Sequence, residues 1–145
     1  MGTLGGIPIR VEHVPSPDDI GIAKAIMHEI HALMERLFCE GAGGTIDLRS
    51  LPAINPASLG LLEKWLSLGE VSAEVKAVGR THVHETAYAG VWWLVHRNSR
   101  EDIVTESIEV ALVPDILKSQ RIDIERSLKM LGSSLAADEA RCRPE

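Results

Sequence analysis

Two amphipathic stretches in the first half of the chain predict helices. Ser16-Pro17 and Asn55-Pro56 both read as helix starts, because a polar cap followed by proline suits the first turn. After each start, apolar residues return every three or four positions, which is the period of one buried helical face. The first face comprises Ala23, Ile26, Ile30, Leu33 and Leu37. The second comprises Leu59, Leu62 and Leu66, with Leu61, Trp65 and Leu68 beside them.

The pattern changes to a period of two after Gly69, where Val71, Ala73, Val75 and Ala77 alternate with polar residues. This alternation predicts a strand with one covered face. We expect a turn at Gly79-Arg80, a long return strand over residues 81–96 with a bulge at Gly90, and a third strand over residues 103–113. A short strand is expected at residues 45–48, and a last helix over residues 122–135.

This order of elements predicts an α+β fold. We expect a mixed, mainly antiparallel sheet of about four to five strands, with helices packed on one face. The predicted organisation is an N-terminal arm or edge strand over residues 1–15, one α+β domain over residues 16–136, and a frayed tail over residues 137–145.

Composition narrows the classes of function. The chain has 145 residues, of which 45% are hydrophobic, and a formal net charge of −6. A broad nucleic-acid footprint is not expected of an acidic chain, and no apolar run approaches the ~20 residues of a membrane span. Cys39 and Cys142 lack a paired spacing, and the N-terminus lacks the pattern of a secretion signal. We therefore expect a cytoplasmic protein.

Several histidines invite a metal interpretation. His28 and His31 share a helix face with Glu35, but they are three apart, whereas the zinc-protease motif places two histidines four apart. His82 and His84 alternate onto one strand face and, with Cys39, allow a metal- or cluster-handling function as the alternative. A solvated helix face explains the first pair better than a metal site does, and the open face of a hairpin explains the second pair better. We therefore expect no bound cofactor.

Glu85 is the residue that most resembles a catalytic group. It falls in phase with Val83 and Ala87, on the face expected to be covered, where an unpaired carboxylate is costly. The sequence leaves three explanations open: a register shift, a place at the sheet margin, or a specific partner. Glu106 and Glu109 point to opposite faces of their strand, so no carboxylate pair for acid–base work is evident. We predict a non-enzymatic protein, with a small enzyme built around Glu85 as a further alternative.

Trp92 and Trp93 are adjacent on a strand, so they point to opposite faces. One is expected under the helices, and the other on the opposite side of the sheet. An exposed tryptophan beside Tyr88 and Leu94 predicts an apolar patch for binding another protein. Cover by a terminal helix, or by a second copy of the chain, is the alternative.

Four ordered segments carry a family resemblance. They are Asp47-Leu48 with Leu51-Pro52, Gly69-Glu70-Val71-Ser72-Ala73, the run from Glu85 to Trp92, and the run from Glu106 to Val110 followed by Val113-Pro114. Together they resemble the C-terminal domain of HupH/HyaF-type hydrogenase expression/formation proteins, over about residues 24–134.

The resemblance implies an accessory role in nickel–iron hydrogenase maturation. It implies a chaperone that binds the iron–sulfur small-subunit precursor before twin-arginine export, beside a thioredoxin-like accessory protein, and it carries over no catalytic residues. Family members often hold two copies of this unit and this chain has one, so we add a homodimer as a hypothesis, formed around Tyr88 and Trp92 or Trp93. The expected partner-binding residues are Gly69, Glu70, Val71, Glu85, Tyr88, Gly90, Trp92, Trp93 and Glu109.

Overall fold

The computed structural model describes residues 14–143, so most of the N-terminal arm lies outside the described residues. The described chain divides into two compact units, one up to Leu112 and one from Val113 onwards. The first unit contains helices α1 (Pro17–Glu40) and α2 (Pro56–Leu66) and five strands. The strands are β1 (Gly44–Asp47), β2 (Ser72–Ala77), β3 (Gly79–Glu85), β4 (Val91–Arg97) and β5 (Ile103–Val110).

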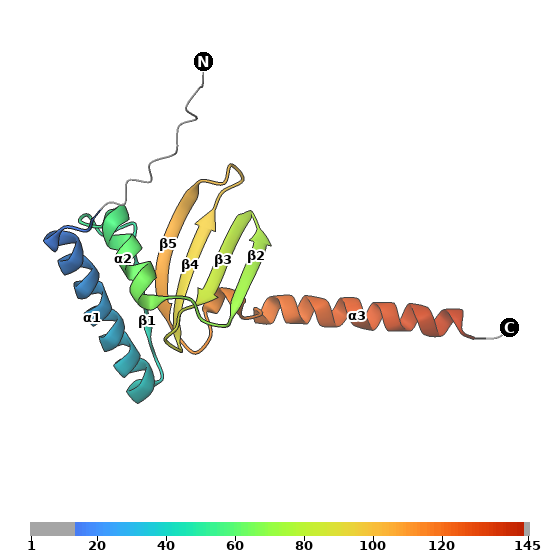
Figure 1. The fold of residues 1–145 in the computed structure, drawn as a ribbon. Coiled ribbons are helices and arrows are strands. Elements are labelled where there is room, and N and C mark those ends of the chain that lie inside the picture. Colours follow the sequence, from blue (N-terminus) through green and yellow to red (C-terminus); the bar gives the residue numbers. More distant parts are fainter. Residues whose placement is uncertain (1–13, 144–145) are drawn as a thin grey trace, which may run out of the picture. The chain divides into compact units, whose positions relative to one another are not determined.

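The five strands form one sheet in the order β1-β5-β4-β3-β2, and every neighbouring pair is antiparallel. The two helices lie side by side on one face of this sheet (Figure 1). The α+β prediction is confirmed, with a sheet that is antiparallel throughout. No helix in the described part of the chain is both long enough and apolar enough to cross a membrane.

Both predicted helix starts are confirmed. Ser16 and Asp19 form a reciprocal capping box at α1, and Asn55 and Ser58 form one at α2. Asn55 does more than cap, because its Nδ2 also donates to Asp19 Oδ1 at 2.7 Å. Asp19 is buried, so this bond joins the N-terminal ends of the two helices away from most of the solvent.

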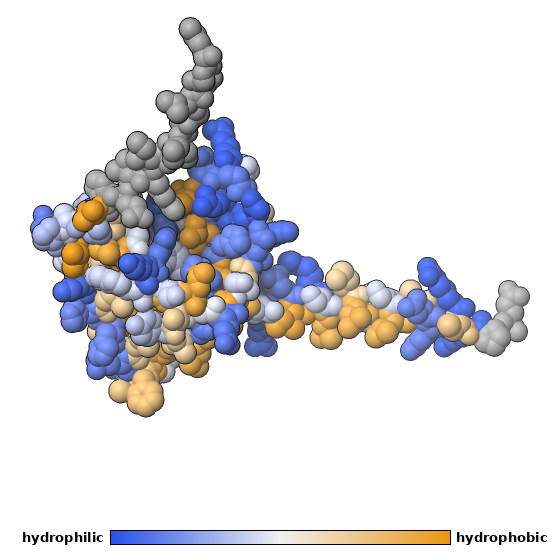
Figure 2. Space-filling view, viewed as in Figure 1, coloured by the Kyte–Doolittle hydropathy of each residue, from blue (hydrophilic) through white to orange (hydrophobic). Residues whose placement is uncertain are grey.

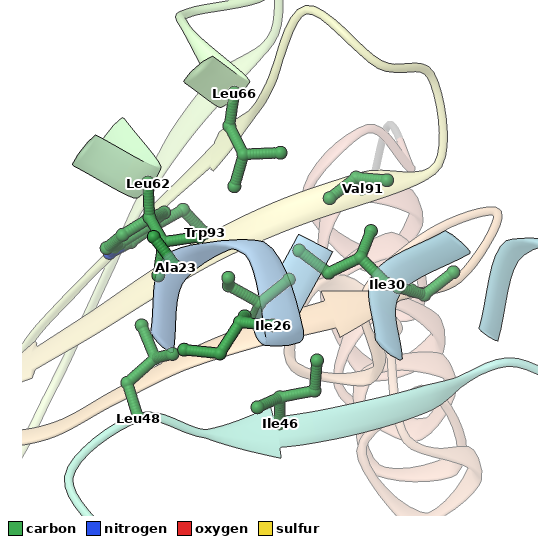
Figure 3. Close-up of a cluster of buried hydrophobic side chains, with 11 residues drawn as sticks. Ala23, Ile26, Ile30, Ile46, Leu48, Leu62, Leu66, Val91 and Trp93 are labelled. Carbon is green, nitrogen blue, oxygen red and sulfur yellow. The ribbon is translucent and has the colours of Figure 1, made fainter. Parts of the chain in front are cut away.

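The core lies between the helix pair and the sheet. Figure 3 shows its side chains converging from α1, α2 and the strands. The predicted helix faces supply much of it, and Leu62 is fully buried. Its buried members are Ala23, Ile26, Ile30, Ile46, Leu48, Leu62, Leu66, Val91, Trp93, Ile108 and Val110. Leu68, expected beside the second face, is 73% exposed instead.

The prediction of one long strand over residues 81–96 is wrong. It is two strands, β3 and β4, joined by a loop over residues 86–90. Thr86 turns inward and is buried, and Gly90 has φ +82°, a conformation that residues with a side chain rarely adopt. The hairpin between β2 and β3 turns at Val78, one residue before the expected turn.

The second unit contains a short 3-10 turn, η1 (Asp115–Leu117), and helix α3 (Arg121–Arg141). The predicted strand over residues 103–113 ends earlier, at Val110. The last helix was expected to end at residue 135, but α3 continues to Arg141, through much of the stretch expected to be a frayed tail.

We expect Asn55→Ala to lower the free energy of unfolding by about 1–2 kcal/mol, because it removes the cap of α2 and the bond to Asp19 together. Ser16→Ala removes a cap alone and serves as the matched variant, with a loss of about 1 kcal/mol. Urea unfolding of both variants measures the difference. A loss at Asn55 no greater than that at Ser16 would show that the bond between the helices adds nothing.

Candidate functional site

The two adjacent tryptophans do separate to opposite faces of the sheet. Trp93 joins the core beneath the helices, whereas Trp92 pairs across the sheet with Glu85 and Glu109 on the other face. The expectation that one of them is exposed is wrong, because Trp92 is 5% exposed and Trp93 is 2% exposed. Trp92 Nε1 donates to the backbone oxygen of Ala111 at 3.0 Å, so its polar atom is also satisfied.

Glu85 lies at the end of β3 and forms hydrogen bonds with other residues of the segments that carry the family resemblance. Its backbone oxygen accepts from the Gly69 N–H, and its own N–H donates to Val71, both at 2.8 Å. Its carboxylate Oε1 accepts from the Gly90 N–H at 3.2 Å. Two of the explanations left open by the sequence therefore hold together, because the half-buried carboxylate is at the sheet margin and has a specific partner.

These bonds shape the loop over residues 86–90. The Ala87 N–H donates to the backbone oxygen of Leu66 at the end of α2, which holds the loop beside that helix. The buried Thr86 hydroxyl bonds to the backbone of Tyr88, and Gly90 accepts from the Ala111 N–H. The loop is held on both sides by hydrogen bonds, while Tyr88 remains 47% exposed.

Tyr88 lines an apolar groove of about 680 Å³ between α1 and α2. Most of its lining is hydrophobic, and Lys24, His28 and His31 are its charged or titratable lining residues. The remaining lining residues are Met27, Ile30, Met34, Trp65 and Leu66. Methionine is flexible and polarizable, so a groove lined by two of them can adapt to apolar side chains of different shapes.

Sequence reasoning missed this groove, although one signal was present. Met27 and Met34 are seven positions apart, which places them on the same face of α1. Trp65 lies on α2, and only the packing of α2 beside α1 brings it next to these methionines. Among the residues predicted to bind a partner, Tyr88 is the one that lines this groove.

A second groove, of about 770 Å³, contains titratable residues that the sequence did not bring together. Glu106 is buried and accepts from Trp93 Nε1 at 3.0 Å. Glu63 of α2 lines the same groove, and partial burial together with the negative charge of Glu106 raises its pKa. His84 lies there too, its ring parallel to that of Trp93, and its pKa is lowered by burial and then by His82.

The residues considered for a metal site do not gather into one. His82 is exposed on β3, and both cysteines are exposed. His31 lies 4.0 Å from Glu35 along α1, with both side chains well exposed. Within residues 14–143, no group of three or more His, Cys, Asp or Glu side chains is arranged to hold a metal ion.

The chain is similar to known proteins both in sequence and in structure. Residues 21–137 match the family described as HupH hydrogenase expression protein, C-terminal conserved region. The structure is similar to hydrogenase expression protein HupH from Thiobacillus denitrificans, with 38% sequence identity and a TM-score of 0.77, over 81% of this chain and 97% of that one.

Curated relatives are similar at lower identity. Hydrogenase expression/formation protein HupQ of Azotobacter chroococcum is 27% identical over 86% of this chain, and HupH of Rhodobacter capsulatus is 28% identical over 85%. In both cases the match spans 44% of the relative, so this chain corresponds to less than half of their length. These matches place the chain among the hydrogenase expression/formation proteins. Within that class, it belongs to the family of the HupH C-terminal conserved region.

Gly69→Ala is expected to destabilise the protein by about 1–3 kcal/mol, because an added Cβ would lie 2.4 Å from the backbone oxygen of Thr86. Gly60→Ala is the matched control, since Gly60 lies within α2 and its Cβ would meet nothing within 4 Å. The control should gain about 0.5–1 kcal/mol from the better helix former. Thermal unfolding compares the two, and a neutral Gly69→Ala would contradict the close approach.

The second groove predicts opposite pH effects for two residues. Because the pKa of His84 is lowered in the folded state, the unfolded state takes up a proton more readily. The contribution of His84 to the free energy of unfolding therefore falls as pH drops through 6.5, the ordinary pKa. Because the pKa of Glu63 is raised, the folded state keeps its proton to higher pH than the unfolded state. The contribution of Glu63 to the free energy of unfolding therefore falls as pH rises through 4.5, the ordinary pKa.

His84→Gln and Glu63→Gln test these signs. The stability of wild type relative to His84→Gln should increase with pH around 6.5, whereas its stability relative to Glu63→Gln should decrease with pH above 4.5. Urea unfolding from about pH 4 to pH 8 covers both windows. Parallel profiles for wild type and the two variants would contradict the assignment.

Proposed function

We propose that this protein is an accessory chaperone in nickel–iron hydrogenase formation, and that it binds the small-subunit precursor before export. The observation that carries the proposal is the groove between α1, α2 and the loop over residues 86–90. A protein of the hydrogenase expression family with an open, methionine-lined groove is suited to holding an apolar segment of another polypeptide.

The position of Tyr88 supports this use of the groove. Its loop is fixed by backbone bonds to α2 and to the end of β3, and the exposed side chain is presented beside Met34 and Trp65. Aromatic residues held in a fixed position are frequent sources of binding energy, because little conformational entropy is lost when they are covered. A client segment would thus meet a preformed aromatic wall opposite a deformable methionine surface.

The charges of the groove and of the whole chain indicate which part of the client each would attract. The lining of the groove includes Lys24 and two histidines and no carboxylate, so it suits an apolar stretch better than a cluster of arginines. The chain as a whole carries a net charge of −6, which attracts a basic flanking segment at longer range. We therefore propose that the groove holds the apolar part of the precursor, and that its basic part contributes a salt-sensitive attraction.

Binding of purified hydrogenase small-subunit precursor, with and without its signal peptide, tests the proposal. Tyr88→Ala should weaken binding by about tenfold or more, because an aromatic contact of the groove is lost. Phe38→Ala is the matched control, since Phe38 is 91% exposed on α1 and does not line the groove. Its affinity should equal that of wild type.

Each outcome has a separate meaning. Loss of binding with Tyr88→Ala alone supports the groove, and dependence on the signal peptide supports a role before export. Equal binding by both variants would place the client elsewhere on the molecule. An absence of binding to either precursor form by the wild-type protein would reject the small-subunit proposal.

A further inference from the structure

Helix α3 carries an apolar surface that nothing in its own unit covers. None of its residues is buried, and Figure 2 shows hydrophobic side chains gathered along one side of it. Four apolar residues of α3 follow the spacing four, three, four: Ile124, Leu128, Leu131 and Leu135. They are 56%, 70%, 60% and 57% exposed. These four residues form an apolar seam along α3.

The spacing of the seam points to a helix as its partner. Apolar residues at alternating intervals of three and four form the contact line of paired helices, where side chains of one helix insert between those of the other. The charged pairs of α3 lie away from this line: Arg126 bonds to Asp123 at 3.3 Å, and Lys129 bonds to Glu125 at 2.9 Å. In the described chain, the buried apolar residues of α1 and α2 already pack in the core.

The seam is symmetric about the point between residues 129 and 130. Leu128 and Leu131 are equally distant from this point, and so are Ile124 and Leu135. An antiparallel copy of α3 therefore places each seam residue opposite another seam residue. Such a two-fold contact is self-complementary and closes at two chains.

Charge distinguishes the antiparallel from the parallel arrangement. Arg121 and Asp138 continue the seam by one step at either end and are again equally distant from its midpoint. In an antiparallel pair, Arg121 of each copy lies opposite Asp138 of the other, whereas a parallel pair sets arginine against arginine and aspartate against aspartate. Ser127, Gly132 and Ser134 flank the seam, and small side chains there allow two helix axes to approach closely.

We propose that α3 forms an antiparallel two-helix interface with α3 of a second copy of this chain. This interface differs from the homodimer suggested by the sequence alone, which placed the contact at Tyr88 and the adjacent tryptophans. It is independent of the client-binding groove, because α3 contributes no residue to that groove.

Sedimentation equilibrium of the full chain tests the interface. Wild type should be dimeric at about 100 µM and dissociate on dilution, as mass action requires. Leu131→Glu should raise the dissociation constant by about 100-fold or more, because it places a charge in the seam. Met130→Glu is the matched control: Met130 is the neighbouring residue and is 67% exposed, but it lies off the seam, so its dimer should persist.

Charge reversal tests the orientation. Arg121→Glu and Asp138→Arg should each weaken the dimer by about tenfold at low salt, and the double variant should restore it. A parallel dimer would give no restoration, because like charges would still face each other. A monomeric wild type, a dimer that survives Leu131→Glu, or equal loss with Met130→Glu would each overturn the proposal.

Discussion

The packing of α1 and α2 on one face of the sheet is the constraint on which the rest of the structure depends. Because side chains alternate along a strand, the choice of covered face decides where every neighbouring residue points. It places Trp93 in the core and sends Trp92 to the opposite side. The bond between Asn55 and Asp19 fixes the same helix pair at its N-terminal end, and the groove lies between the two helices.

Two residues of the segments that carry the family resemblance, Gly69 and Glu85, stabilise the backbone around the end of β3. Gly69 allows the connection between α2 and β2 to approach Thr86. Glu85 binds that connection through its N–H and backbone oxygen, and binds Gly90 through its carboxylate. The carboxylate of Glu85 thus acts as a structural hydrogen-bond acceptor for Gly90. Its phase on β3, which suggested a catalytic group, is explained by its bond to Gly90 at the sheet margin.

Local signals were predictable from the sequence, and long-range juxtapositions were not. The helix starts at Ser16 and Asn55 were clear because cap and proline act within one turn. The break between β3 and β4 was missed because its cause is tertiary: Thr86 turns inward and the following loop bonds to α2. Likewise, Glu63 and Glu106 affect each other only after α2 packs on the sheet, so neither residue type nor spacing indicated their meeting.

The loop over residues 86–90 is held largely through its own main-chain atoms. The Ala87 N–H donates to the backbone oxygen of Leu66, and the Gly90 N–H donates to the carboxylate of Glu85. The Gly90 oxygen accepts from the Ala111 N–H. Main-chain bonds are indifferent to the identity of an outward side chain. The residue at position 88 is therefore free to drift in sequence while the scaffold that presents it stays the same. In the proposed chaperone, such an arrangement would separate folding from recognition, because one exposed residue could change without altering the backbone that presents it.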